Sequence, residues 1–113
     1  MSENYIPISN AKGTLVINAL TVIYATPGGK IAKIKNVKFA PNDFTLPYTI
    51  YFYILYQSGA EQSLVYKKRL EAGDSVDDTT VYLLSDDMKL AAMVDIDGVI
   101  EYSVTGKEII PQQ

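Results

Sequence analysis

Apolar and polar positions along residues 21–39 predict a strand, a tight turn and a second strand. Residues 22–24 are β-branched or aromatic, and such side chains suit a pleated, half-buried surface. The turn is Pro27-Gly28-Gly29, in which proline presets one backbone angle and glycine adopts positive φ at little cost. Lysines then alternate with apolar residues as far as Phe39. We therefore predict a hairpin at the edge of a small antiparallel sandwich.

The apolar phase slips inside the second strand of this stretch. Ala32 and Ile34 share one face by strict alternation, whereas Val37 and Phe39 have the opposite parity. A β-bulge is the usual cause of such a slip. The pattern therefore predicts a bulge beside Asn36.

Residues 48–56 form the most strand-like run of the chain. One face would carry Tyr48, Ile50, Phe52, Ile54 and Tyr56, and the other Thr49, Tyr51, Tyr53 and Leu55. Both faces are apolar or aromatic, whereas a strand with one solvated face should alternate with polar residues. Either the monomer buries both faces, or a partner covers the second one.

Further short strands are expected at residues 14–18, 63–66 and 79–84. The pair Asp97-Gly98 predicts a tight hairpin within residues 89–104. With a two-residue loop, the predicted core face of this hairpin consists of Ala91, Met93, Ile100, Tyr102 and Val104.

Strand signals dominate the whole sequence, and no stretch shows a sustained helical period with caps. About eight short strands at a spacing of roughly 8–12 residues indicate a sandwich or barrel. We predict an all-β, antiparallel β-sandwich with jelly-roll-like character. Residues 1–12 would form an N-terminal arm or edge strand, residues 13–110 the sandwich, and residues 111–113 a C-terminal tail.

Composition removes several function classes. The chain has 113 residues, no cysteine, no histidine and a net charge of -3. Disulfides, cysteine nucleophiles, histidine bases and His- or Cys-ligated metals are therefore excluded. The acidic balance makes nucleic acid an unfavourable partner. No signal peptide or membrane-spanning apolar run is visible, so we expect no membrane partner.

Acidic residues gather at the predicted turns. Asp95-Ile96-Asp97-Gly98 has part of a calcium-loop pattern, but it lacks the third acidic position and the final glutamate. Aspartate is favoured in turns for conformational reasons alone. No two carboxylates are placed across a cleft, as a glycosidase would need. We therefore expect no metal, no cofactor and no catalytic residues, and we predict that the protein is not an enzyme.

The tyrosines, of which there are nine, are the most informative feature. Tyrosine is enriched at interfaces because it gives a large contact area at low entropic cost. We predict an interface at Tyr51, Tyr53, Leu55 and the basic cluster Lys67, Lys68 and Arg69, with Tyr66 and Tyr82 nearby. The alternatives are an ordinary tyrosine-rich core, stacking on sugars, and, for the basic cluster, a solvated sheet edge.

A succession of motifs resembles a known family. These are Tyr24-Ala-Thr-Pro-Gly-Gly-Lys30, Ile34-Lys-Asn-Val37, Leu70-Glu-Ala-Gly-Asp-Ser-Val76 and Gly98-Val-Ile-Glu-Tyr-Ser-Val-Thr-Gly-Lys-Glu-Ile109. Their order is similar to that in small β-sandwich virion proteins of tailed bacteriophages, over most of the chain. One departure is Asp86-Asp87, where the family pattern has glycine-aspartate.

This resemblance implies a structural role on a phage particle as a capsid decoration protein, a head fibre or a tail accessory protein. We expect assembly with itself, with a trimer favoured over a dimer or ring, and with capsid or tail proteins. The protein would be made in the host bacterial cytoplasm and reside in the virion. The alternative function is a carbohydrate-binding or host-surface adhesion module.

Overall fold

The protein is built from strands in the part of the chain that the structure describes. The computed structural model describes residues 4–15, 17–42, 47–56, 61–85, 88–95 and 99–110. Within these ranges there is no helix. The strands are β1 (Asn4–Thr14), β2 (Thr21–Ala25), β3 (Ile31–Asn42), β4 (Tyr48–Tyr56), β5 (Glu61–Leu70), β6 (Val76–Asp78), β7 (Tyr82–Leu84), β8 (Lys89–Val94) and β9 (Val99–Ile110).

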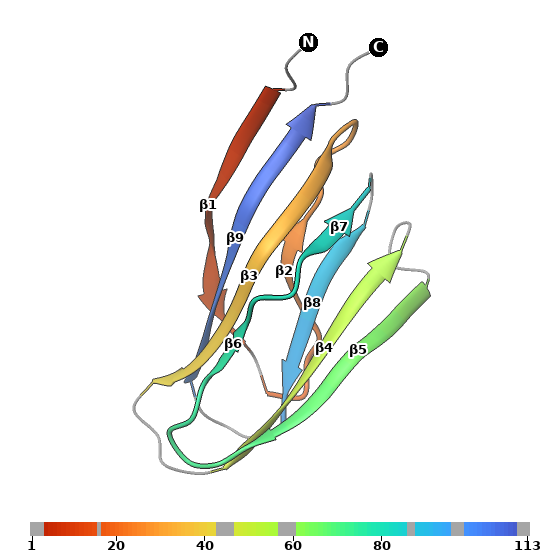
Figure 1. Ribbon diagram of the computed structural model, residues 1–113. Coiled ribbons are helices and arrows are strands. Elements are labelled where there is room, and N and C mark those ends of the chain that lie inside the picture. Colours follow the sequence, from red (N-terminus) through yellow and green to blue (C-terminus); the bar gives the residue numbers. More distant parts are fainter. Residues whose placement is uncertain are drawn as a thin grey trace.

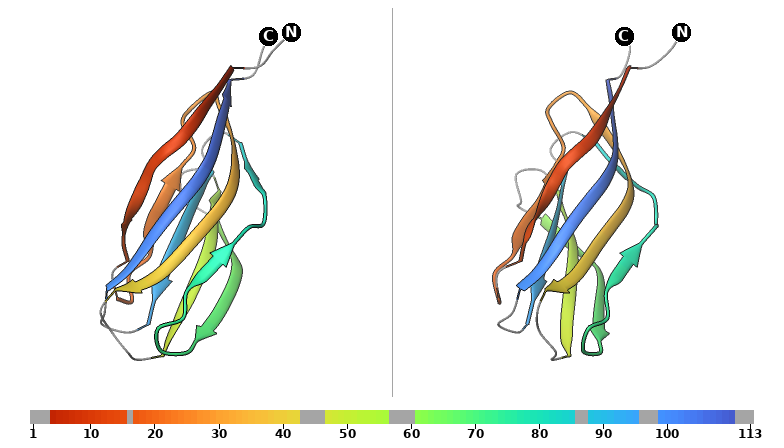
Figure 2. Two further views of the ribbon diagram at one scale, coloured as in Figure 1. Left: turned by 60° about the vertical axis from the view of Figure 1, so that its left-hand side comes forward. Right: turned by 90° about the vertical axis from the view of Figure 1, so that its left-hand side faces the viewer.

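Two antiparallel sheets pack face to face (Figures 1 and 2). Sheet A has the order β1-β9-β3-β6, with β7 also paired to β3. Sheet B has the order β2-β8-β4-β5. The molecule is elongated, with extents of 50 × 27 × 19 Å.

The strands pair in nested order, as they would in one long hairpin whose two arms are wrapped into a sandwich. β4 pairs with β5 at the tip, β3 with β6 and β7, β2 with β8, and β1 with β9. Because β6 and β7 share one strand position beside β3, eight positions result, which is the number in a jelly roll. The predicted jelly-roll-like sandwich is therefore confirmed. Several strands are longer than expected, with β3 and β9 each spanning 12 residues.

Both hairpins predicted from local turn signals are wrong. β2 lies at the edge of sheet B, whereas β3 lies inside sheet A. The turn between them, with the Lys30 N–H donating to the Pro27 carbonyl at 3.2 Å, carries the chain from one sheet to the other. β8 and β9 are likewise in different sheets. The Asp97-Gly98 turn lies outside the described residues.

The core fills the space between the sheets. Its fully buried members include Ile34, Val37, Phe39, Tyr48, Ile50, Phe52, Leu84, Leu90, Val94 and Ile100. The rings of Phe39 and Phe52 join the two layers edge to face, with centroids 5.9 Å apart. From β8 the core cluster takes Leu90, Ala92 and Val94. Of the predicted core face, Ile100 and Val104 belong to this cluster and Tyr102 packs against it. Ala91 is fully buried but lies outside the cluster, as does the half-buried Met93, so the phase predicted for β8 is wrong. Both phases of this strand are apolar, and alternation therefore could not separate them.

The predicted bulge in β3 is confirmed. The register of β3 on β9 shifts between Ile34 and Asn36. The Asn36 amide group donates to Asp77 Oδ1 at 2.5 Å and to the Asp78 carbonyl at 3.3 Å, which ties the bulge to β6. Opposite the bulge, Gly106 lets the backbone of β9 approach β3 closely. A Cβ at this position would lie 2.9 Å from Ile34 Cα.

Candidate functional site

The outer face of sheet B is the surface on which most of the predicted interface residues meet. Strand register places Tyr51 between Lys67 on β5 and Met93 on β8, and Tyr53 between Leu64 and Ala91. We call this surface the tyrosine face, and it comprises Val22, Thr49, Tyr51, Tyr53, Leu55, Gln62, Leu64, Lys67, Arg69, Lys89, Ala91 and Met93.

The tyrosine face is largely apolar although it points away from the core. Leu64 is 52% exposed and Val22 is 45% exposed. Tyr51, Tyr53 and Met93 are half-buried. Leu55 is only 7% exposed, so it adds little to the accessible surface of the face. Exposed apolar side chains that gather on one face of a soluble protein are typical of interaction sites.

The basic cluster divides between the two faces of sheet B. The Lys67 ammonium lies over the Tyr51 ring, 5.4 Å from its centroid, which is a cation–π geometry. Arg69 pairs with Thr49 and shares this face. Lys68 instead pairs with Ile50, whose side chain is in the core, so Lys68 belongs to the opposite side of the sheet.

Tyr66 and Tyr82 do not join the tyrosine face, and that expectation is wrong. Both rings contact Phe52 between the sheets, with centroid distances of 5.1 Å and 5.7 Å. Tyr66 pairs with Phe52, so its side chain points to the same, core side of sheet B. Tyr82 lies on β7, which belongs to sheet A. No short-range pattern in the sequence distinguishes these tyrosines from Tyr51 and Tyr53.

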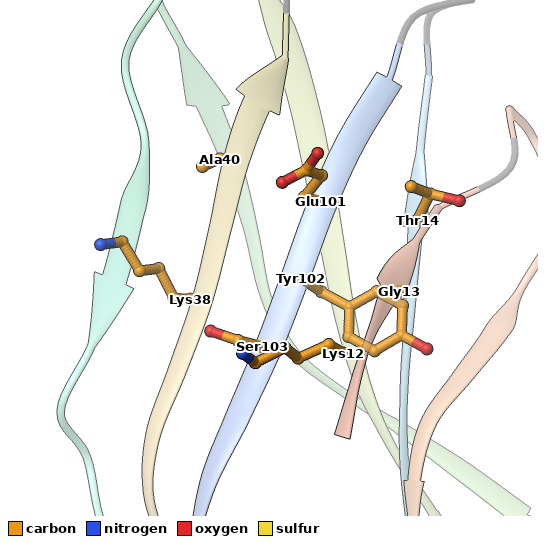
Figure 3. Close-up of a pocket in the computed structure, with 8 residues that line it drawn as sticks. All are labelled: Lys12, Gly13, Thr14, Lys38, Ala40, Glu101, Tyr102 and Ser103. Carbon is orange, nitrogen blue, oxygen red and sulfur yellow. The ribbon is translucent and has the colours of Figure 1, made fainter. Parts of the chain in front are cut away.

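A hollow of about 560 Å³ lies on sheet A, over β1, β9 and β3 (Figure 3). Small residues, Gly13, Ala40 and Ser103, line it. The Tyr102 ring lies beside Gly13, where a Cβ would approach the phenol oxygen to 2.6 Å. Lys38 points away from β9, so the cations of this surface do not converge on the hollow.

The described residues contain no group of three or more His, Cys, Asp or Glu side chains that could hold a metal ion. The same part of the chain has no helix of the length and apolarity needed to cross a membrane.

Comparison with known proteins adds little to this geometry. No family model matches the chain, and no curated protein matches its sequence. A chain in the structure of infectious bursal disease virus, Gt strain, is similar, with a TM-score of 0.35 and 11% sequence identity. The similarity covers 95% of this chain and 32% of that chain, so this chain spans about a third of the viral chain's length. A likeness this distant carries no argument about function.

Proposed function

We propose that the protein is a non-enzymatic structural component of a tailed-phage virion that acts through protein–protein assembly. The observation that carries this proposal is the apolar tyrosine face on the outside of sheet B. A jelly roll is an architecture that viral capsid domains use, and this analogy of fold supports the proposal without establishing it. The protein would be made in the host bacterial cytoplasm and assembled onto the particle as a decoration, head-fibre or tail accessory protein.

The tyrosine face supports self-association in particular. Three cations, Lys67, Arg69 and Lys89, accompany its aromatic and aliphatic residues and suit an acidic neighbour. Glu71 and Asp74 are exposed in the turn that follows β5 and offer that charge. Contacts between two different surfaces of the same chain build closed rings when the rotation closes. These contacts do not fix the number of subunits; among the possible assemblies we favour a trimer over a dimer or ring, with capsid or tail proteins as further partners.

Light scattering across a dilution series tests the assembly. We expect a mass of about three chains of 12.5 kDa each. Leu64→Glu places a charge on the tyrosine face and should give monomers. Leu83→Glu is the matched control, because Leu83 is 65% exposed on sheet A, beside Lys33. A monomer at every concentration would overturn self-association, and absence of the protein from purified particles would overturn the virion role.

The second candidate function is a carbohydrate-binding or host-surface adhesion module. It is favoured by the half-buried pair Tyr51 and Tyr53, whose rings could stack on sugars, and by the use of jelly rolls in lectin domains. A glycan array read with the wild-type protein and with Tyr51→Ala and Tyr53→Ala tests it. Specific binding that both substitutions abolish would support this function, and an empty array would remove it.

A further inference from the structure

The outer face of sheet A lies on the opposite side of the sandwich from the tyrosine face, and it is rich in lysine. On β3 the residues that face the core are buried, so the residues between them point outward. Strand register adds outward lysines from β9 and β1. We call this surface the lysine face, and its cations are Lys12, Lys33, Lys35, Lys38 and Lys107.

The lysine face has a charge opposite to that of the whole chain. Among the described residues, two carboxylates share this face with the five lysines, Asp77 on edge strand β6 and Glu101 on β9. Asp77 accepts a hydrogen bond from the Asn36 amide group at 2.5 Å. The chain as a whole has a net charge of -3. Positive charge is therefore segregated onto one face of an acidic protein, and such segregation steers partners of opposite charge to that face.

The position of these lysines removes one usual explanation for lysine on strands. Lysine on an edge strand prevents pairing with another chain. β3 and β9 lie inside sheet A and are paired on both sides, so their lysines protect no edge. Lys33 also lies directly opposite Lys107, and like charges at such positions repel each other. An acidic partner over this face would compensate that repulsion.

The lysines are spread over the face and do not gather around one point. Lys12 and Lys38 lie on either side of Ser103, on three neighbouring strands, and the Lys38 side chain points away from β9 (Figure 3). From strand spacing and rise, the lysine face is about 10 Å across and about 15 Å along the strands. A small anion cannot contact all of these cations at once. Their spacing therefore fits an extended acidic surface.

Exposed aliphatic side chains beside the lysines favour a protein as the partner. Leu83 is 65% exposed and pairs with Lys33, and Ile31, two residues before Lys33, is 37% exposed. Protein interfaces combine apolar contacts with a polar rim, whereas a nucleic acid offers mainly phosphates to a basic surface. The acidic balance of the chain also opposes nucleic acid. The lysine face therefore suits a protein surface that carries acidic side chains.

We infer that the lysine face docks on the acidic surface of a different protein. The ammonium groups would lie beside carboxylates of that partner, while Leu83 and Ile31 make apolar contacts with it. The tyrosine face belongs to the other sheet, so the two surfaces can be occupied at the same time (Figure 2). The inference therefore holds whether or not the protein self-associates.

Fluorescence anisotropy with a labelled poly-L-glutamate peptide and the full chain tests the inference. We expect saturable binding at about 50 mM NaCl that weakens at least about tenfold at 300 mM, because salt screens exposed charges. No saturable binding, or binding that salt leaves unchanged, would overturn the assignment. An oligothymidylate of equal charge and phosphatidylglycerol vesicles are the competing probes. Tighter binding of either one would show that the class of partner is wrong.

A triple substitution places the binding on the lysine face. It neutralises three exposed cations through Lys12→Gln, Lys35→Gln and Lys38→Gln. Because each exposed ion pair contributes about a factor of two, the affinity for poly-L-glutamate should fall about tenfold. Wild-type affinity in this variant would refute the site.

The matched control removes the same amount of charge from β5. It neutralises three other exposed cations through Lys67→Gln, Lys68→Gln and Arg69→Gln. The control should keep the wild-type affinity, and an equal loss in both variants would refute the site because the attraction would then have no fixed place. Light scattering of the first variant should give the wild-type mass. A changed mass would make the lysine face a contact between copies, which would also overturn the inference.

Discussion

Replacing Gly106 by alanine should destabilise the protein more than any other single methyl addition at a described glycine. The new Cβ would overlap the Lys33 carbonyl oxygen and lie 2.9 Å from Ile34 Cα. Both obstacles are backbone atoms of β3, a strand inside sheet A, so no side-chain rotation relieves the overlap. β9 must therefore move away from β3.

The loss of stability has two parts, the cost of overpacking and the cost of weakened hydrogen bonds between β9 and β3. Overpacking in a well-packed region costs about 1–3 kcal/mol. Each backbone hydrogen bond weakened between β9 and β3 adds about 1 kcal/mol. We expect a total near 4 kcal/mol, against a stability of about 5–15 kcal/mol for a domain of this kind. At about 4 °C per kcal/mol, the melting temperature should fall by about 15 °C.

Gly73→Ala provides the matched control. Gly73 has φ +82°, which alanine adopts unfavourably, but no atom lies within 4 Å of its would-be Cβ. The substitution should therefore cost only about 1–2 kcal/mol of backbone strain. Urea unfolding followed by circular dichroism gives both values. The reasoning would be refuted if Gly106→Ala cost no more than Gly73→Ala.

Two further predictions concern the core and the pH dependence of stability. Phe52→Ala should cost about 3–5 kcal/mol in urea unfolding, because this fully buried ring contacts Phe39, Tyr66 and Tyr82; a loss below about 1 kcal/mol would contradict that packing. The folded state lowers the pKa of Asp78, so its contribution is present above the unfolded carboxyl pKa of about 4 and is lost as pH falls through the folded pKa. Asp78→Asn should therefore be less stable at pH 7 and lose less stability than wild type on acidification to about pH 2, as measured by unfolding at both pH values; an unchanged acid slope would count against this role.

Short-range patterns predicted the elements of the fold well. Alternation located β2, β3, β4 and β9, and the phase slip beside Asn36 located the bulge. The absence of a helical period led to a two-sheet architecture of about eight strand positions. These features are local, because a side-chain period of two depends only on the strand itself.

Strand partners could not be obtained in the same way. Pro27-Gly28-Gly29 shows that the chain reverses, but a reversal within one sheet and a crossing between two sheets have the same turn residues and the same alternation. Burial of Tyr24, whose hydroxyl donates to Glu108 at 2.7 Å, holds β2 against the opposite sheet. Glu108 is 84 residues away, and nothing near Tyr24 indicates it.

The same contrast between local patterns and strand partners holds for the candidate binding surfaces. The two apolar faces of β4 correctly indicated an outward-facing Tyr51 and Tyr53. The separation of Lys68 from Lys67 followed only from strand register. Tyr66, Asp78 and Tyr82 lie together although they come from β5, β6 and β7, and no spacing in the sequence indicates that they converge.

The central place of β9 in sheet A has a consequence for how the chain folds. β9 separates β1 from β3, and its register joins Asn4 to Ile110. Until the β9 segment has been synthesised, β1 has no strand to pair with in the described part of the chain. Sheet B can form first from β2, β4, β5 and β8, which all precede β9. Closure of such distant contacts is slow, so we expect sheet A to be completed only after β9 has been synthesised, over about milliseconds to seconds.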